Sequence, residues 1–256
     1  MEKLLDGKIA LVTGGGRGIG RAIADAMARE GAHVIIADIV ADRVAEAAEE
    51  MRAAGAKAEG LALDIGDREA VQKALASVAE KHGGIDVVVN NAVWIRYQAL
   101  PDIDEETLDR MLRVGVKGMI WMSQAAGPYM AKRGGGAIVN ICSTAAIAAT
   151  ANSVAYAAVK GAVAALTRAL AVDLGVDGTR ANAIAPGFIE TPAAVKNIGE
   201  HGMSKRREVT PLQKLGKVED IANLAVFLAS GRAGHITGEL ITVDGGLGTS
   251  SIQPKQ

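Results

Sequence analysis

The stretch TGGGRGIG, residues 13–20, lies between the apolar run KIALV and the helix-like segment RAIADAMAREG. Five of its eight residues are glycine, which loses more conformational freedom on folding than any other residue. This composition indicates either a flexible loop or a backbone that must approach another group closely. A glycine-rich turn that ends a strand and opens a helix presents free backbone N–H groups and the positive end of the helix dipole. The context therefore favours a phosphate-binding turn.

The rest of the chain alternates short apolar runs with alanine-rich segments of helical spacing, such as 42–55 and 68–83. Nearly continuous apolar runs are typical of parallel strands that are covered on both faces. The pattern predicts an α/β fold, a doubly wound, Rossmann-like parallel sheet with helices on both faces, in one domain over residues 1–256. The predicted strands are residues 9–14, 33–38, 58–64, 85–91, 136–142, 179–186 and 239–245.

Composition and charge exclude several classes of function. A net charge of -1 argues against general binding to nucleic acid or anionic membranes, and no apolar run reaches the roughly 18 residues of a membrane span. The single cysteine, Cys142, allows no internal disulfide and fits a reducing compartment, so we expect a cytoplasmic protein. The histidines are scattered without a carboxylate or cysteine cluster at ligand spacing, so no metal is expected: His33, His82, His201 and His235.

Asp38 ends the second predicted strand, twenty residues after Gly18. A carboxylate at this position can accept hydrogen bonds from the adenosine ribose hydroxyls and would repel a 2′-phosphate. It therefore favours NAD over NADP, although Arg17 could face a phosphate and Ile39 supplies no second cation. The structural alternative for Asp38 is the N-cap of the following helix.

The glycine spacing TGxxxGxG and several later motifs resemble those of the short-chain dehydrogenase/reductase family, in its small single-domain form. The resemblance covers essentially the whole chain and implies an oxidoreductase with a nicotinamide cofactor and a small-molecule substrate, assembled as a homotetramer or homodimer. Within the family, Asp64 and Ile65 match the adenine contact, and Asn91 and Ala92 line the cofactor cleft. The predicted cofactor-binding residues are Gly14, Gly16, Arg17, Gly18, Ile19, Gly20, Asp38, Ile39, Asp64, Ile65, Asn91, Ala92, Tyr156, Lys160, Pro186, Gly187, Ile189 and Thr191.

Tyr156 and Lys160 are four residues apart in the helical segment YAAVK and so share a helix face. A free tyrosine has a pKa near 10, and a nearby ammonium favours the phenolate. Tyr156 can then exchange a proton with a substrate hydroxyl, while Ser143, just past a strand, hydrogen-bonds the substrate oxygen. The resemblance also places Lys160 on the nicotinamide ribose. The alternative is a surface i,i+4 pair.

Two positions depart from the family pattern. In the segment VGVKG, Gly115 stands where the family commonly has an asparagine, usually the fourth member of the catalytic set. That asparagine stabilises a helix distortion, and its main-chain carbonyl holds a water bonded to the lysine. Glycine keeps the carbonyl but loses the amide. Val93 replaces the glycine of NNAG and is expected to narrow the substrate entrance.

The substrate side is expected to follow these motifs. Ser143, Val93, Trp94, Tyr97 and Phe188 are the predicted substrate-binding residues, with ordinary loop packing as the alternative for the aromatic ones. The poorly patterned segment of about residues 190–216 interrupts the last βα crossover, which suggests a substrate-loop insertion. Its cations could attract an anionic substrate, but a solvated face is the better-supported interpretation.

These observations predict an NAD(H)-dependent oxidoreductase that transfers a hydride between the cofactor and a small or medium secondary alcohol or ketone. A second possibility is a nucleotide-binding protein with little turnover, because Gly115 breaks the catalytic set. A sugar epimerase or dehydratase usually needs a larger substrate domain, for which 256 residues leave no room.

Overall fold

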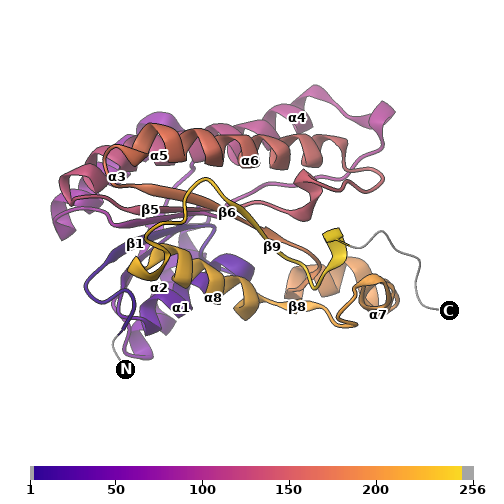
Figure 1. Ribbon diagram of the computed structural model, residues 1–256, viewed down its shortest axis with the longest axis horizontal. Helices are drawn as coiled ribbons and strands as arrows, with labels where there is room; N and C mark the ends of the chain where they lie inside the picture. The colour runs from indigo at the N-terminus through magenta and orange to yellow at the C-terminus, as the bar shows by residue number, and fades with distance from the viewer. Residues whose placement is uncertain (1–2, 250–256) are drawn as a thin grey trace.

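A computed structural model describes residues 3–249 and contains a seven-stranded sheet at its centre (Figure 1). Every pairing in this sheet is parallel, in the order β3-β2-β1-β4-β5-β6-β9. The seven strands predicted from sequence are all present, and the doubly wound fold is confirmed. Their bounds are β1 Ile9–Thr13, β2 His33–Asp38, β3 Ala58–Ala62, β4 Val87–Asn90, β5 Ala137–Ile141, β6 Arg180–Pro186 and β9 Leu240–Val243.

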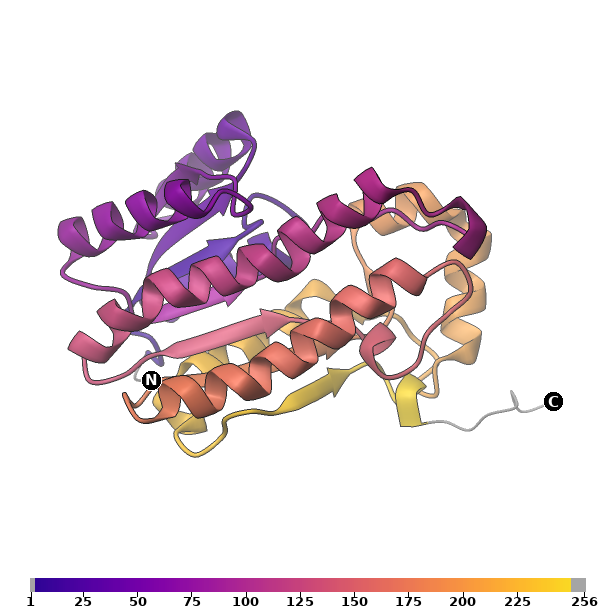
Figure 2. The same cartoon turned by 90° about the horizontal axis from the view of Figure 1, so that it is seen from above.

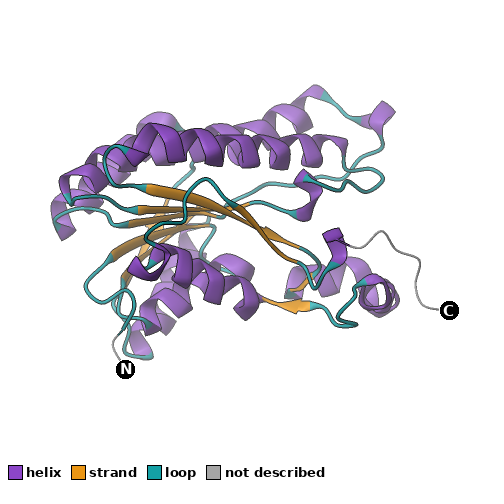
Figure 3. Cartoon of the chain, in the orientation of Figure 1, coloured by secondary structure: helices purple, strands orange, loops and turns teal. Residues whose placement is uncertain are grey.

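Helices cover the sheet on both faces (Figures 1 and 3). One layer contains α1 (Gly18–Arg29), α2 (Ala41–Ala53) and α8 (Val218–Ala229). The other contains α3 (Arg68–His82), α4 (Glu105–Leu112), α5 (Gly118–Lys132) and α6 (Val154–Gly175). Viewed from above, α5 and α6 run side by side across this second face (Figure 2). Two layers of helices explain why the strands are apolar on both sides.

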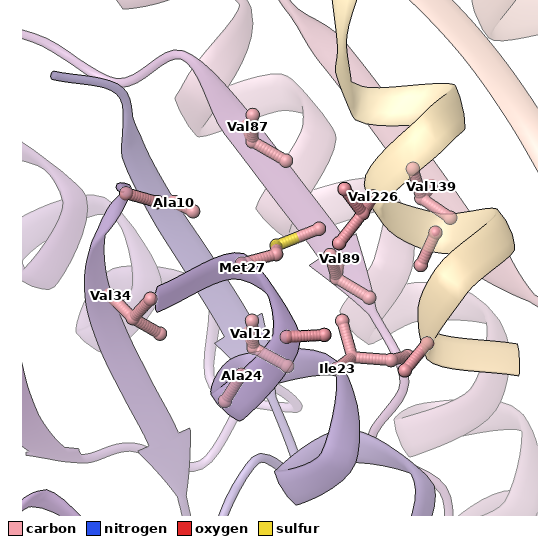
Figure 4. Close-up of a cluster of buried hydrophobic side chains, with 14 of the residues drawn as sticks. Ala10, Val12, Ile23, Ala24, Met27, Val34, Val87, Val89, Val139 and Val226 are labelled. Carbon is pink, nitrogen blue, oxygen red and sulfur yellow. The ribbon is translucent and has the colours of Figure 1, made fainter. Parts of the chain in front are cut away.

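The core divides along the sheet because successive side chains of a strand point to opposite faces. In β1, Ala10 and Val12 pack with Ile23 and Met27 of α1, as Figure 4 shows. Leu11, between them, belongs to the cluster on the other face. Both clusters are almost fully buried, so the central strands are held rigidly and fix the positions of the loops at their ends.

The strand order reverses between β1 and β4, which are neighbours in the sheet. β1 leads to β2 on one side, and β4 leads to β5 on the other. In open α/β sheets, ligands bind outside the carboxyl ends of the strands at such a switch point. The glycine-rich turn follows β1 and Asn91 follows β4, so both lie at this position.

The segment expected as an insertion contains a long helix, which the weak sequence pattern did not predict. α7 (Pro192–Val209) lies between the short strands β7 (Ile189–Glu190) and β8 (Gly216–Lys217), which pair with each other. The Thr191 hydroxyl caps its start by accepting the Ala194 N–H at 3.1 Å. Gly199 adopts φ 71° and kinks the helix, which explains why no continuous period of 3.6 residues is visible.

The composition of α6 bears on the expectation that no apolar run is long enough for a membrane span. α6 has 22 residues, and its best 18-residue window has a mean hydropathy of 1.3, enough to cross a membrane by length and composition. The helix packs against β6 and carries the buried residues Val159, Lys160 and Val163. We interpret it as a core helix whose apolar side covers the sheet, because a charged lysine points inward from it.

Candidate functional site

The glycine-rich turn has the backbone that its sequence indicates. Gly14 and Gly18 have φ values of 61° and 57°, a region that side-chain-bearing residues rarely adopt. A Cβ on Gly20 would collide with the Gly14 carbonyl oxygen, and a Cβ on Gly16 would lie 2.6 Å from the Arg43 side chain. α1 begins at Gly18 with no side-chain cap among the described residues, so its first N–H groups point towards the turn.

Thr13 ties this turn to the end of β4. Its buried hydroxyl donates to the Val89 carbonyl at 3.2 Å and accepts the backbone N–H groups of Asn91 at 2.9 Å and Ala92 at 3.0 Å. The Asn91 side chain in turn donates to the carbonyls of Thr13 at 2.9 Å and Gly14 at 3.2 Å. Asn91 therefore positions the turn in this structure, and Thr13 is a positioning residue whose role the sequence did not reveal.

Asp38 lies at the end of β2, with only 8% of its side chain exposed, and it has a partner that the sequence pattern did not indicate. Arg43 Nη1 donates to Asp38 Oδ1 at 2.8 Å, and the Val40 N–H approaches the same oxygen at 3.2 Å. The Arg43 side chain thus lies between Asp38 and Gly16. Both contacts use Oδ1, so Oδ2 can accept a ribose hydroxyl. The pair was hidden because Arg43 is on α2, one turn beyond the strand.

The other predicted adenosine residues are placed around this position. Asp64 accepts a hydrogen bond from Arg113 Nη1 at 2.9 Å and one from the Gly66 N–H at 2.8 Å, so its carboxylate is already bound within the chain. Ile65 is buried. Arg17, within the glycine turn, and Ile39, directly after Asp38, are both exposed.

Ser143, Tyr156 and Lys160 come together at the carboxyl end of β5. Ser143 follows that strand, and its hydroxyl accepts the Ala145 N–H at 3.1 Å. Lys160 is 2% exposed, and its Nζ donates to the Ile141 carbonyl at 2.8 Å and lies 5.8 Å from the centre of the Tyr156 ring. α6 presents both side chains on one face, as the four-residue spacing predicts.

The electrostatics of this trio differ from the sequence-based expectation. Burial raises the pKa of Tyr156 to about 12, and the hydrogen bond with Ser143 acts in the opposite direction. Burial also lowers the pKa of Lys160 to about 8. In the chain by itself, burial therefore outweighs the effect expected of the Lys160 ammonium on the phenol, because removal from water opposes both charges. A further positive charge at the site would be needed.

The position of Gly115 shows how the chain manages without an asparagine. It lies in a π-helical turn, η2 (Arg113–Lys117), between α4 and α5, so the helix distortion forms without the amide side chain. A Cβ on Gly115 would lie 2.6 Å from Val159 Cγ1. Val159 directly precedes Lys160 on α6 and is 1% exposed, so its methyl group occupies the space beside the missing side chain.

Cys142 is not a candidate nucleophile. Its thiol is buried beside α6 and lies 3.2 Å from the Lys160 carbonyl. Burial raises its pKa, so the reactive thiolate is disfavoured. This agrees with the interpretation of Cys142 as a buried strand residue.

Of the predicted aromatic substrate residues, Tyr97 contacts the trio directly, and Trp94 packs against the same apolar cluster as Tyr156. The Tyr97 ring packs edge-on against Tyr156 with 5.4 Å between ring centres, and it remains 57% exposed. Phe188 lies under the Arg206 guanidinium of α7, 4.9 Å from its ring centre. Val93 is exposed, and the guanidinium of Arg110 on α4 lies 4.4 Å from the centre of the Trp94 ring.

The segment after β6 completes the mouth of the site. Pro186 ends the strand, and the Gly187 N–H donates to the Val243 carbonyl at 3.0 Å. A Cβ on Gly187 would lie 2.6 Å from Asp244 Cβ, which requires glycine where the two loops meet. Ile189 and Thr191 follow and lead into α7, so the helix is attached directly to this edge.

The residues fit a nicotinamide dinucleotide. The glycine turn leaves a cradle that a Cβ would fill, the N-terminus of α1 offers N–H groups to a pyrophosphate, and Asp38 stands at the end of the neighbouring strand. Ser143 and Tyr156 offer hydroxyls for an oxygen of a second ligand. The arrangement can therefore hold a dinucleotide and move a proton beside it.

Comparison with known proteins agrees with this geometry. A family described as enoyl-(acyl carrier protein) reductase matches residues 14–248. The 3-oxoacyl-[acyl-carrier-protein] reductase FabG of Thermotoga maritima is 37% identical over 95% of this chain and 98% of its own length.

Two of the solved structures that resemble this chain contain a nicotinamide cofactor. Gluconate 5-dehydrogenase from Burkholderia cenocepacia, in complex with NADP and tartrate, has a TM-score of 0.93 and 33% identity, over 97% of this chain and 98% of its own. A 7α-hydroxysteroid dehydrogenase complexed with NADH and 7-oxo glycochenodeoxycholic acid has a TM-score of 0.90 and 36% identity, over 96% of both chains. The chain belongs to the short-chain dehydrogenase/reductase family of oxidoreductases.

Proposed function

We propose that this protein is an NAD(H)-dependent oxidoreductase that interconverts a small or medium secondary alcohol and its ketone. The observation that carries the proposal is the meeting of Ser143, Tyr156 and Lys160 at the same sheet edge as the glycine turn and Asp38. The trio supplies groups that can transfer a proton, and the glycine turn with Asp38 supplies a binding site for a dinucleotide beside it.

In the oxidation direction, the Ser143 hydroxyl binds the alcohol oxygen and the Tyr156 phenolate removes the hydroxyl proton. A nicotinamide cofactor held by the glycine turn and Asp38 would supply the hydride acceptor for the alcohol carbon and, in its oxidised form, a positive charge at the site. That charge would oppose the effect of burial, which raises the pKa of Tyr156 to about 12. Lys160 contributes less charge than a free lysine because burial lowers its pKa to about 8.

The preference for NAD(H) is proposed from Asp38. Its carboxylate, 8% exposed at the end of β2, would meet the 2′ position of the adenosine ribose and repel a phosphate there. Arg43 neutralises part of this charge at 2.8 Å, so we expect a preference rather than complete exclusion of NADP(H).

The substrate class is proposed from the site and from its relatives. Their printed names refer to an oxoacyl group, to carbon 5 of gluconate and to a 7α-hydroxysteroid, each a ketone or a secondary alcohol. In this chain, Tyr97 beside Tyr156 and Phe188 beside Arg206 form an aromatic border that suits a substrate with some apolar surface. We further propose a homotetramer or homodimer, which light scattering on the purified protein would distinguish.

The test is a screen of secondary alcohols and ketones with NAD(H) and NADP(H). The formation or loss of the reduced cofactor measures turnover. Turnover with NAD(H) on at least one substrate is the expected result. If the protein binds NADH but turns over none of the panel, the alternative of a nucleotide-binding protein with little activity replaces this proposal. The intact trio and the π-helical turn at Gly115 argue against that alternative.

A further inference from the structure

A second cluster of polar side chains lies near the amino ends of the strands, whereas the candidate active site lies at their carboxyl ends. His33 begins β2, Glu59 lies in the edge strand β3, and His82 ends α3. Because Asp38 ends the strand that His33 begins, the two sites are separated by the strand length, roughly 16 Å. Glu59 pairs in register with Ile35, which shares a strand face with His33, and α3 packs over that face.

The three side chains converge on one point. Glu59 Oε1 lies 3.2 Å from His33 Nε2 and 3.4 Å from His82 Nε2, and one ligand atom of each residue lies within 4.8 Å of the others. The two imidazole rings are 4.4 Å apart between centres. Zinc takes nitrogen and oxygen ligands at about 2.0–2.2 Å in tetrahedral geometry, which places neighbouring ligand atoms about 3.3–3.5 Å apart. The two measured separations agree with this value.

The Nε2 atoms of His33 and His82 are both buried, and among the described residues neither forms a hydrogen bond of good geometry, although both lie close to Glu59 Oε1. His82 is nine-tenths buried, with 10% of its side chain exposed, so water does not substitute fully for a partner. A buried polar atom without a partner is costly, and it calls for a ligand.

Glu59 has a second partner on the solvent side. Its Oε2 accepts a short hydrogen bond of 2.6 Å from Lys81, whose side chain is 62% exposed. Oε1 is therefore free to face the two histidines. Lys81 orients the carboxylate in the way that a hydrogen-bonding neighbour orients a carboxylate bound to a metal. An open hollow of about 560 Å³, lined by His33, Glu59 and Lys81 among others, gives an ion and its water access to the cluster.

We propose that His33, Glu59 and His82 form a binding site for one zinc ion, with a water as the fourth ligand from the open hollow. Two histidines and a carboxylate are a common zinc ligand set, and the site links the amino end of β2 and the edge strand β3 to the end of α3. The ion would be structural, because the cluster lies at the sheet edge away from Tyr156. The sequence did not reveal this cluster because its members are 26 and 23 residues apart and meet only in the folded sheet.

The experiment titrates zinc chloride into the metal-free wild-type protein, with a chromogenic chelator as competitor, and measures stoichiometry and affinity. We expect one ion per chain and a higher unfolding temperature in its presence, because the folded state alone assembles the ligands. His82→Gln and Glu59→Gln should each weaken binding by about 10- to 100-fold or more. His235→Gln is the matched control, since that histidine is exposed on another part of the surface.

Two further measurements separate zinc ligation from nonspecific binding. Cobalt in place of zinc should give the strong visible absorption of a four-coordinate ion in the wild type and in His235→Gln, and not in His82→Gln. Lys81→Met should retain binding and tighten it, because the competing ammonium is removed from Glu59. The proposal is overturned if no stoichiometric binding occurs, or if His82→Gln binds as well as His235→Gln. Either result would mean that Glu59 simply pairs with two histidines.

Discussion

The contact between Gly115 and Val159 makes a specific prediction about the residue that departs from the family pattern. Gly115→Asn restores the asparagine that the resemblance leads one to expect. Its Cβ would lie 2.6 Å from Val159 Cγ1, whereas carbon atoms in contact normally stand about 3.5–4.0 Å apart. The two helices must therefore separate by about 1 Å, or Val159 must leave its rotamer.

The expected loss follows from three effects. Overpacking of this size costs about 1–3 kcal/mol, and a buried amide without a partner costs about 1–3 kcal/mol more. Replacing glycine in a helix returns only about 0.3 kcal/mol for asparagine. We therefore expect Gly115→Asn to lower the free energy of unfolding by at least about 2 kcal/mol, or the melting temperature by about 4–8 °C.

Denaturant unfolding of a double-mutant cycle tests this reasoning. Val159→Ala removes the blocking methyl groups and should itself cost about 1.6 kcal/mol or somewhat more. The double variant should be more stable than the sum of the two losses predicts, with a coupling of about 1–3 kcal/mol. If Gly115→Asn is as stable as the wild type, or if the two losses simply add, Val159 does not fill the asparagine's space.

Two other predictions concern charged residues of the site. Asp38→Ala should reduce the ratio of kcat/KM for NAD(H) over NADP(H), whereas Arg43→Gln should increase it. The reason is that the carboxylate repels the 2′-phosphate and the arginine offsets that repulsion. Equal ratios in the wild type and both variants would refute this. Lys160 has a pKa of about 8 in the folded chain against an ordinary 10.5, so the unfolded state binds more protons between these values and stability rises with pH there. Between pH 8 and pH 10.5, the free energy of unfolding of the wild type should rise by on the order of 3 kcal/mol more than that of Lys160→Met. If the two proteins give parallel curves of unfolding free energy against pH, the lysine does not titrate in a buried position.

The features that local sequence determines were predictable. The seven strands are apolar runs because both faces of the sheet are covered, and glycine at residues 14 and 18 is required by positive φ values. The four-residue spacing of Tyr156 and Lys160 likewise fixes their common face before any tertiary contact is known. These parts were predicted because the cause lies within one segment.

The features that depend on contacts between segments were not predictable. Arg43 reaches Asp38 from another element, Val159 fills the space beside Gly115, and the cluster of His33, Glu59 and His82 joins residues from two strands and a helix. The pKa of Tyr156 was expected to fall because of Lys160, but burial of the site opposes it. Burial and packing are properties of the assembled fold, and the sequence pattern of one segment does not contain them.

The most direct test of the proposed function is the rate of NADH formation by the wild type and by Tyr156→Phe on an alcohol found in the screen, with the affinity for NADH measured on both. Phenylalanine keeps the ring packed against Tyr97 and removes only the hydroxyl. We expect kcat to fall by about 10²- to 10⁴-fold while the Kd for NADH changes little. A Tyr156→Phe variant that keeps near-normal turnover would contradict the account, because the proton would then be transferred by another group.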